Sequence, residues 1–340
     1  MKIAFCLHIS LTYGGGGEKW TINVANALEK RNHKIEIRAL PYTPHKRKVL
    51  KTQDVLNENI LYTESWHHGL DADVAYVFYN PLSNIFFKMK CPRVAGIHSQ
   101  VYFLSKTPPI TYGIPAIISR SLYKAIGRVD LSSFDGIHIV NEFPVYHNNV
   151  FYIPNFVNAE IYHPVKPKSD KFTALFIGRP TWQKGWDTFF EAASILKRKH
   201  KDIEFKVAGF DHKKTGKIRY LGYISDENEL AKIYSSAHVA LLPSRADTFG
   251  VTILESLACG TPVVTTPSSP HKNLRLPLFY AETADEFAKA IEQLRSLWIK
   301  NPGAYQKISE EAKNAAKKYD MQVILPKIEE MFVKVSKSQM

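Results

Sequence analysis

FTALFIGRPTWQKGWDTFFEAASILKRK, residues 172–199, is the stretch that decides the fold class. It begins with an apolar run of strand length that ends at Gly178, and apolar residues recur at helical spacing from Trp186 onward. The same order of strand, turn and helix is repeated along the chain, starting with the apolar run Lys2–His8. Strands and helices that alternate in this way predict an α/β fold, in which parallel sheets are covered by helices on both faces.

The length of the chain predicts two domains. Its 340 residues exceed what one hydrophobic core usually supports. Prolines and charged residues between Pro154 and Lys171 have the composition of a linker. We therefore expect doubly wound domains over residues 1–160 and 161–320, and a final helix over residues 321–340. Two such domains would face each other across a cleft, since sheets of this kind bind ligands outside the carboxyl ends of their strands.

Composition excludes several classes of protein. Hydrophobic residues make up 45% and charged residues 23%, which excludes a disordered or collagen-like chain. Three cysteines far apart in the sequence indicate reduced thiols rather than a disulfide scaffold or a zinc site: Cys6, Cys91 and Cys259. No apolar run approaches the roughly 20 residues of a membrane span, and Met1–Leu7 is too short for a signal peptide. We expect a cytoplasmic protein, with a peripheral place on the inner face of the cell membrane as the alternative.

The net charge is strongly positive. Lys and Arg number 45 against 32 Asp and Glu, which gives +13. Basic clusters occur at His45–Lys48 with Lys51, and at Lys197–Lys201. Each cluster is either a solvated surface or a contact for phospholipid or another polyanion, and the apolar Val49 and Leu50 favour the second interpretation for the first cluster.

A glycine-rich segment, Gly14–Gly17, follows the first predicted strand. Glycine lets the backbone approach a ligand closely, and the N-terminus of the next helix favours anions. The dinucleotide fingerprint GxGxxG fails here, because Lys19 stands at its sixth position, and no GKS or GKT follows to complete a phosphate-binding P-loop. The segment is therefore either a loop that faces a ligand through Gly15 and Gly16 or a plain tight turn.

Two cations follow the strand that opens the second half. Arg179 and Lys184 stand five residues apart, between the end of that strand and the next helix. This places both at the carboxyl edge of the predicted sheet. Together they could neutralise a diphosphate, Arg through a forked contact and Lys as a point charge. In isolation, two ordinary surface cations would give the same pattern.

Two carboxylates follow a later strand. Asp247 and Glu255 stand eight residues apart, with Phe249 and Gly250 between them just before a predicted helix. Both could point at one ligand whose phosphates meet the N-terminus of that helix. Carboxylates accept hydrogen bonds from diols, so sugar hydroxyls suit them. A solvated acidic residue is the simpler alternative for each.

Taken together, these segments resemble the GT-B glycosyltransferases of the large retaining family 4, the glycosyl transferases of group 1. No single segment is specific, but their order and spacing along nearly the whole chain are. The segments that carry the resemblance are Gly14–Glu18, Ile153–Asn155, Gly178–Gly185, Leu221–Tyr223, Asp247–Glu255 and Ala258–Val264. The resemblance implies two Rossmann-like domains, the first binding the acceptor and the second the nucleotide sugar, with the final helix crossing back to the first domain.

The resemblance also implies roles for individual residues. Arg179 and Lys184 would bind the donor diphosphate and stabilise the leaving group. Asp247 would contact the donor sugar, Glu255 the ribose, and His98 the reacting centre. The remaining donor-binding residues would be Gly15, Gly16, Tyr223, Phe249, Gly250, Val251 and Thr252. No metal ligands and no cofactor are expected, because the two cations take the place of a metal.

This chain departs from the family pattern at several places, among them Phe156 and Asn158, which stand where the hinge motif usually has Gly and Asp. Asp247 stands where the first glutamate is usual, and its shorter side chain reaches less far toward the donor sugar. Residues 266–278 lack the usual glycine-rich turn, and residues 100–113 match no pattern that indicates an acceptor.

The resulting expectation is a retaining, metal-independent glycosyltransferase. It would move a sugar from a nucleotide-diphosphate donor to a hydroxyl of a glycolipid, a lipid-linked oligosaccharide or a polysaccharide precursor, at an anionic membrane surface in the lipid cases. Nucleic acid is not an expected partner. Two alternatives remain: a nucleotide-sugar 2-epimerase, or a basic scaffold of the same fold that binds nucleic acid or lipid without catalysing transfer.

Overall fold

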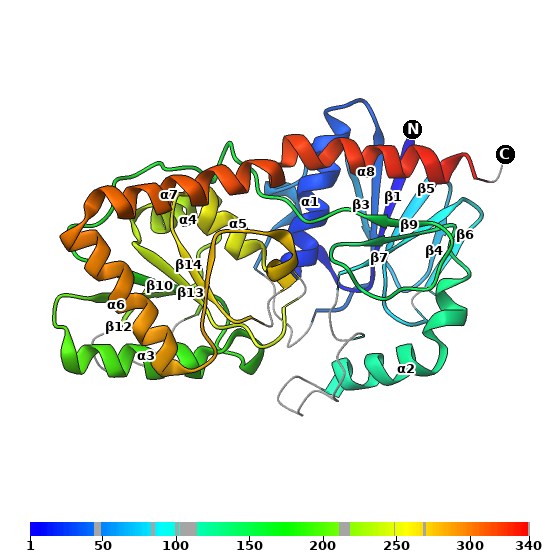
Figure 1. Ribbon diagram of the computed structural model, residues 1–340. Coiled ribbons are helices and arrows are strands. Elements are labelled where there is room, and N and C mark those ends of the chain that lie inside the picture. Colours follow the sequence, from blue (N-terminus) through cyan, green and yellow to red (C-terminus); the bar gives the residue numbers. More distant parts are fainter. Residues whose placement is uncertain are drawn as a thin grey trace. The chain divides into compact units, whose positions relative to one another are not determined.

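The computed structural model describes residues 1–43, 49–82, 86–98, 102, 114–210, 218–247, 249–267 and 270–338. Contacts between residues divide the described chain into two units (Figure 1). The first unit runs to Pro154 and takes up the chain again from Ile324, and the second runs from Asn155 to Val323. The sequence places the corresponding boundaries at residues 160 and 320.

The first unit is built on seven parallel strands in the order β3-β2-β1-β5-β7-β8-β9. Strands β1, β5, β7 and β8, near the centre, are apolar and buried along almost their whole length. The edge strands β3 and β9 are short and partly exposed. The strands are β1 (Lys2–Leu7), β2 (Lys34–Ala39), β3 (Leu61–Glu64), β5 (Val74–Phe78), β7 (Arg93–Ile97), β8 (Gly136–Ile139) and β9 (Val150–Tyr152), with β4 (His68–Leu70) and β6 (Phe87–Met89) pairing separately.

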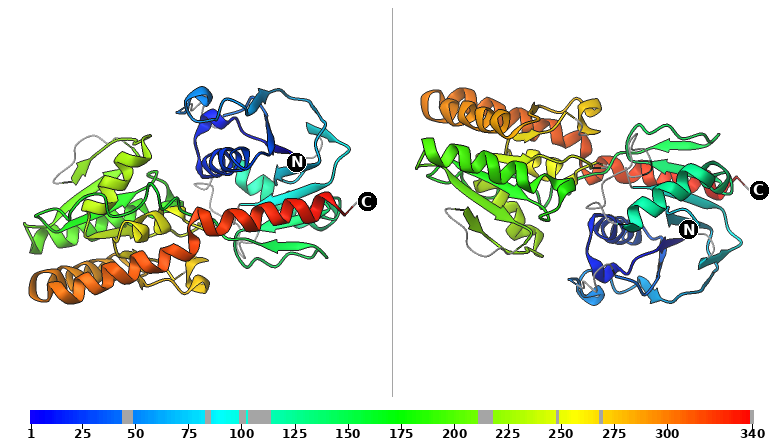
Figure 2. Two further views of the ribbon diagram at one scale, coloured as in Figure 1. Left: turned by 90° about the horizontal axis from the view of Figure 1, so that it is seen from above. Right: turned by 90° about the horizontal axis from the view of Figure 1, so that it is seen from below.

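Among the described residues, three helices belong wholly or mostly to the first unit. They are α1 (Gly16–Glu29), α2 (Ile114–Leu131) and α8 (Met321–Ser336), with short 3-10 turns η1 (Leu11–Tyr13) and η3 (Thr52–Asp54). Trp20 of α1 and Phe332 of α8 both pack against the rings of Phe5 and Tyr76 in the sheet. Figure 2 shows α8 running along this unit. The last helix of the chain therefore completes the core of the first domain.

The second unit contains six parallel strands in the order β12-β11-β10-β13-β14-β15. Both sheets thus reverse their strand order beside their first strand, which is the arrangement of a Rossmann-like domain. The strands are β10 (Thr173–Ile177), β11 (Glu204–Ala208), β12 (Ile218–Tyr220), β13 (Val239–Leu242), β14 (Val263–Thr265) and β15 (Leu278–Tyr280).

Helices cover both faces of the second sheet (Figure 1). Apolar residues of α3 and α6 form one core with the strands, and α4 and α5 lie on the other side. The helices are α3 (Trp186–Lys199), α4 (Glu227–Ser236), α5 (Val251–Ala258), α6 (Ala284–Lys300) and α7 (Pro302–Ala316), with 3-10 turns η7 (Trp182–Lys184), η8 (Pro270–Leu274) and η9 (Lys317–Tyr319).

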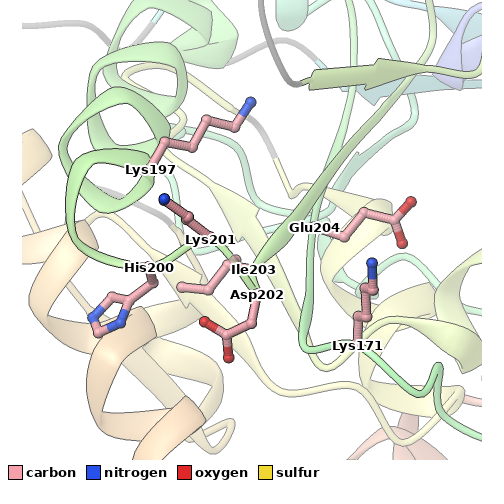
Figure 3. A pocket seen from close by; sticks show the side chains of 7 residues that line it. All are labelled: Lys171, Lys197, His200, Lys201, Asp202, Ile203 and Glu204. Carbon is pink, nitrogen blue, oxygen red and sulfur yellow. The ribbon is translucent and has the colours of Figure 1, made fainter.

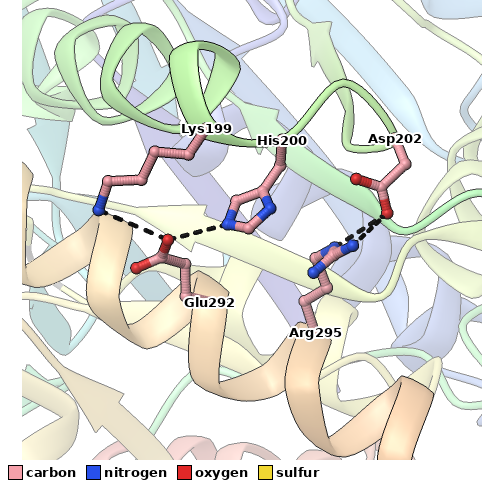
Figure 4. A network of polar contacts seen from close by, with 5 residues as sticks. All are labelled: Lys199, His200, Asp202, Glu292 and Arg295. Atoms are coloured by element: carbon pink, nitrogen blue, oxygen red, sulfur yellow. Dashed lines mark hydrogen bonds and ion pairs between the residues drawn. The ribbon is translucent and has the colours of Figure 1, made fainter.

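Polar contacts fasten the end of α3 to α6 (Figure 4). Glu292 Oε1 lies 2.9 Å from His200 Nε2 and 3.6 Å from Lys199 Nζ. Arg295 Nε donates to Asp202 Oδ2 over 3.0 Å. The hydrogen bonds from Arg295 hold the pKa of Asp202 below its usual value, and His200 does the same for Glu292. This part of the second basic cluster therefore has a structural role.

The α/β fold with two Rossmann-like domains is confirmed. The glycine segment is partly corrected, because Gly16 and Gly17 already lie in the first turn of α1. Helix α7 begins at Pro302, since Asn301 accepts a hydrogen bond from the Ala304 amide and proline suits the first turn. No helix among the described residues is long and apolar enough to cross a membrane.

Candidate functional site

In the second domain the switch in strand order lies between β10 and β13. Ligands of doubly wound sheets bind at the carboxyl ends of the strands at this point. Arg179 follows β10 directly after Gly178, Lys184 closes η7, and Asp247 lies in the loop after β13. The fold therefore brings these three predicted residues to one edge of the sheet.

Lys184 and Asp247 are in direct contact. Lys184 Nζ donates to Asp247 Oδ2 over 2.6 Å, and the two side chains are 27% and 17% exposed. The sequence assigned them to different parts of a donor molecule. Their pairing places a positive and a negative group side by side at the switch point, where each can still be reached by a ligand.

Gly185 allows the loop after β10 to contact the loop after β13. Its φ of +64° is left-handed, and a Cβ atom there would lie 1.9 Å from the carbonyl oxygen of Pro243. Only glycine satisfies both conditions without a shift of the backbone. The loop after β10 can therefore lie directly against the loop after β13.

Arg245 holds the loop after β13 against the segment that follows β10, and the sequence analysis did not predict this role. Its two terminal nitrogens each lie 2.7 Å from a carboxylate oxygen of Asp187, and its guanidinium lies over the Trp182 ring. Its backbone amide donates to the carbonyl of Gln183 over 2.8 Å. The hydrogen bonds from the Arg245 side chain hold the pKa of Asp187 below its usual value. Arg245 thus supports the segment that carries Lys184.

Glu255 is held by a buried tyrosine. It lies on α5, and the Tyr234 hydroxyl of α4 donates to its Oε2 over 2.8 Å. Burial first, and the Glu255 carboxylate second, raise the pKa of Tyr234 well above its usual value. The phenol therefore stays protonated and donates to the carboxylate, which fixes the Glu255 side chain.

The residues at the start of α5 differ in what they can offer a ligand. Gly250 has a left-handed φ of +65° and immediately precedes the helix. Val251 and Thr252 begin it and are partly exposed. Phe249 is buried and packs against Tyr319, so a contact from this residue to a ligand would come from its backbone. Tyr223, another predicted donor-binding residue, is 37% exposed.

In the first domain, Gly15 and Gly16 lie at the start of α1, after β1. A Cβ atom on Gly16 would meet nothing within 4 Å, whereas one on Gly14 would lie 2.5 Å from Val49 Cγ2. Gly14 therefore serves packing, and Gly16 borders open space.

His98 directly follows β7, also at a carboxyl edge. Its ring stacks on Phe78 with centroids 4.5 Å apart, and Nε2 lies 2.7 Å from the Tyr76 hydroxyl. Burial, and secondarily the neighbouring His138, lower the pKa of His98 well below its usual value. The imidazole is therefore neutral at physiological pH.

Two hollows on the surface lie at the opposite, amino edges of the sheets. The one in the second domain has a volume of about 230 Å³, and Lys171, Lys197, His200, Lys201, Asp202, Ile203 and Glu204 line it (Figure 3). The other, of about 530 Å³, adjoins the starts of β1, β2 and β3. The second basic cluster thus belongs to a different edge from Arg179 and Lys184.

Other predictions cannot be placed. Residues 45–48 of the first basic cluster, residues 100, 101 and 103–113, and residues 268 and 269 of the segment 266–278 lie outside the described residues. Within the described chain, no group of three or more His, Cys, Asp or Glu side chains could hold a metal ion.

Comparisons with known proteins agree on one kind of enzyme. Residues 171–296 match the family model for "Glycosyl transferases group 1". The alpha-galactosylglucosyldiacylglycerol synthase of Streptococcus pneumoniae is 25% identical over 315 residues, which cover 81% of this chain and 79% of that protein. A GDP-mannose-dependent alpha-(1-6)-phosphatidylinositol dimannoside mannosyltransferase of Mycobacterium tuberculosis is 31% identical over 138 residues, 36% of each chain.

A solved structure has the same fold over the whole length. It is that of Anabaena Alr3699/HepE in complex with UDP-glucose, with a TM-score of 0.72 and 14% identity, covering 98% of this chain and all of that one.

Proposed function

Because the chain is a glycosyltransferase of the GT-B fold, we propose that it is a retaining, metal-independent enzyme that uses a nucleotide-diphosphate sugar. The observation that carries this proposal is the cluster at the switch point of the second sheet, where Lys184 lies 2.6 Å from Asp247 and Arg179 follows the neighbouring strand. Such an edge combines positive charge for phosphates with a carboxylate for hydroxyls.

The diphosphate is the part of the donor that Lys184 and Arg179 recognise. Glycosyl transfer develops negative charge on the departing diphosphate, and positioned cations stabilise that charge without having to rearrange. Asp247 orients the Lys184 ammonium through one hydrogen bond, which leaves that group two further N–H donors for phosphate oxygens. Lys184 and Arg179 thereby supply the positive charge that a metal ion supplies in other transferases.

Glu255 and the first turn of α5 bind the rest of the nucleotide. The Glu255 carboxylate, fixed by Tyr234, accepts hydrogen bonds from the ribose hydroxyls. The amides of Val251 and Thr252, at the positive end of α5, favour the phosphates. The family resemblance assigns Gly15, Gly16 and His98 to the donor sugar and the reacting centre.

The family resemblance implies the course of the reaction. The bond between the anomeric carbon and the diphosphate oxygen breaks, and both of its electrons leave with the phosphate. The hydroxyl oxygen of the acceptor attacks from the same face of the sugar, and its proton passes to the departing phosphate. The anomeric configuration is therefore retained, and no covalent enzyme intermediate forms.

We assign the acceptor to the lipid-linked or glycolipid class. The two curated relatives described above are named for a diacylglycerol glycolipid and for a phosphatidylinositol mannoside. A net charge of +13 favours anionic headgroups, so the enzyme would work at the surface of a membrane.

Thermal unfolding in the presence of UDP, GDP, ADP and CMP, and then of the matching nucleotide sugars, tests the donor. One nucleoside diphosphate should raise the transition temperature selectively, since a ligand at 100 times its Kd stabilises the folded state by about 2.7 kcal/mol. Transfer from its sugar conjugate to vesicles that contain diacylglycerol or a glycolipid should follow. No shift with any nucleotide would overturn the proposal, and transfer only to soluble saccharides would overturn its lipid part.

A further inference from the structure

Three polar rings of the first domain form a chain of hydrogen bonds. Tyr76 lies on β5, His98 directly after β7 and His138 on β8, three strands that are neighbours in the sheet. The Tyr76 hydroxyl lies 2.7 Å from His98 Nε2 and 2.6 Å from His138 Nδ1. His138 Nε2 lies 2.8 Å from the carbonyl oxygen of Ile153.

The direction of each hydrogen bond follows from the last one. A carbonyl oxygen only accepts, so His138 Nε2 carries a hydrogen and donates it to Ile153. His138 is almost fully buried, and burial lowers its pKa to about 4, so the ring is neutral and its Nδ1 is an acceptor. Tyr76 therefore donates its only hydroxyl hydrogen to His138 Nδ1.

The same reasoning fixes the tautomer of His98. With its hydrogen given to His138, the Tyr76 oxygen accepts from His98, so His98 Nε2 carries a hydrogen. His98 is neutral, so its Nδ1 has a lone pair and no hydrogen. Within the described residues, Nδ1 has no hydrogen-bond partner, and the His98 side chain is partly exposed at the carboxyl edge.

Packing holds the chain of rings in place. The rings of Trp20 and Tyr76 stack with centroids 5.2 Å apart, and the Phe78 ring stacks on His98. A Cβ atom on Gly96 would lie 2.1 Å from the Tyr76 hydroxyl oxygen. The glycine on β7 thus leaves room for that hydroxyl between the two histidines.

We propose that Tyr76 and His138 are positioning residues that keep His98 protonated on Nε2 and open on Nδ1, so that His98 accepts a hydrogen bond from a neutral sugar hydroxyl. A phosphate oxygen of the donor has no hydrogen to give at neutral pH, and it would be repelled by the Nδ1 lone pair. This proposal rests on the proposed function for the identity of the substrate, but the tautomer itself does not depend on it.

The test uses the whole protein with ¹⁵N-labelled histidine. Long-range ¹H–¹⁵N spectra distinguish the two neutral tautomers of each ring, and His98→Asn assigns the signals of His98. The wild type should show His98 with a hydrogen on Nε2. Tyr76→Phe keeps the ring but removes the hydroxyl, and should leave a mixture of tautomers at His98.

Tyr305→Phe is the matched control. Tyr305 is also buried, and its hydroxyl donates to a backbone carbonyl, that of His238, over 2.8 Å in the second domain. Both variants lose one buried hydroxyl, but only Tyr76→Phe should change the His98 signals. The turnover number of Tyr76→Phe should fall about five- to tenfold relative to Tyr305→Phe, the effect of one weakened neutral hydrogen bond.

Each outcome decides the proposal. A hydrogen on Nδ1 of His98 in the wild type would overturn it, and so would equal turnover of the two variants. The proposal would be supported if the wild type shows a hydrogen on Nε2 of His98 and if Tyr76→Phe loses both this single tautomer and turnover. Failure of the proposed function would look different, because the wild type would then bind no nucleotide and transfer no sugar while the spectra still report the tautomer.

Discussion

The carboxyl edges of the two sheets have the same topology and opposite chemistry. The edge of the second sheet carries charged pairs, Lys184 with Asp247 and Arg245 with Asp187. The edge of the first sheet carries the neutral rings of Tyr76, His98 and His138. One edge therefore presents charge and the other presents neutral donors and acceptors.

Burial explains why the two edges differ. Ion pairs are costly to remove from water, and the charged pairs of the second edge remain partly exposed. Neutral imidazole and phenol groups can be enclosed among aromatic rings when each polar atom has a partner, as with Tyr76 and His138. The second edge is suited to a charged diphosphate and the first to uncharged hydroxyls.

The largest effect should come from breaking the charged edge. Lys184→Ala removes the ammonium that we propose to stabilise the charge developing on the leaving group. Loss of one positioned donor of this kind lowers turnover by about 10²- to 10³-fold, or roughly 3–4 kcal/mol. The turnover number for sugar transfer measures the effect, and the unfolding transition shows whether the fold is intact.

Lys232→Ala is the control for that substitution. Lys232 lies exposed on α4 and pairs with Glu229 one turn earlier. It carries the same charge and should have turnover close to that of the wild type. Turnover that falls equally in both variants would indicate a general effect of net charge and contradict the role of Lys184.

Much of the charged edge could be predicted from sequence because its residues stand in segments that directly follow predicted strands, and such segments meet at the carboxyl edge of a parallel sheet. Arg179 and Lys184 stand in one loop, and Asp247 and Glu255 in one loop and the helix that follows. The neutral edge could not, because Tyr76 and His138 lie inside buried strands rather than in loops that follow them, and they meet only when β5, β7 and β8 assemble. His98 was found through the family resemblance alone.

The fold, too, could be predicted only in part from the sequence. Alternation of buried strands and amphipathic helices predicted most of both sheets. Strand β3 was missed because Leu61–Glu64, at the edge of its sheet, has no buried apolar run. The clamp of Arg245 on Asp187 was missed because it depends on Gly185 bringing two loops together.

Glycines offer a second, smaller contrast between the edges. Gly185→Ala should lower the free energy of unfolding of the second domain by at least about 1–3 kcal/mol, the cost of a left-handed conformation for a residue with a side chain. Contact with the Pro243 carbonyl adds to that cost. Gly16→Ala should be neutral or stabilising, since a Cβ atom there meets nothing within 4 Å. Denaturant unfolding of both variants measures the difference, and equal midpoints would contradict the account of the loop contact.

Acid should destabilise the first domain more than the second, and the difference should grow gradually as the pH falls. Burial lowers the pKa of His138 from 6.5 to about 4, so between these values the unfolded chain binds a proton that the folded chain does not. The free energy of unfolding therefore falls as the pH falls, by about 1.4 kcal/mol per pH unit for such a group. Burial also lowers the pKa of His8 and His98 in the first domain, and that of His238 in the second.

The first domain should thus lose protection sooner on acidification. Hydrogen exchange of β8 and of β11, corrected for the intrinsic dependence on pH, measures this between pH 7.5 and 5.5. His138→Gln should flatten the dependence for β8, and His67→Gln, at an exposed position, should not. The burial of the neutral rings is the expected source of the greater loss of protection in β8. Equal loss of protection in β8 and β11 would therefore contradict the view that these buried rings distinguish the first edge from the second.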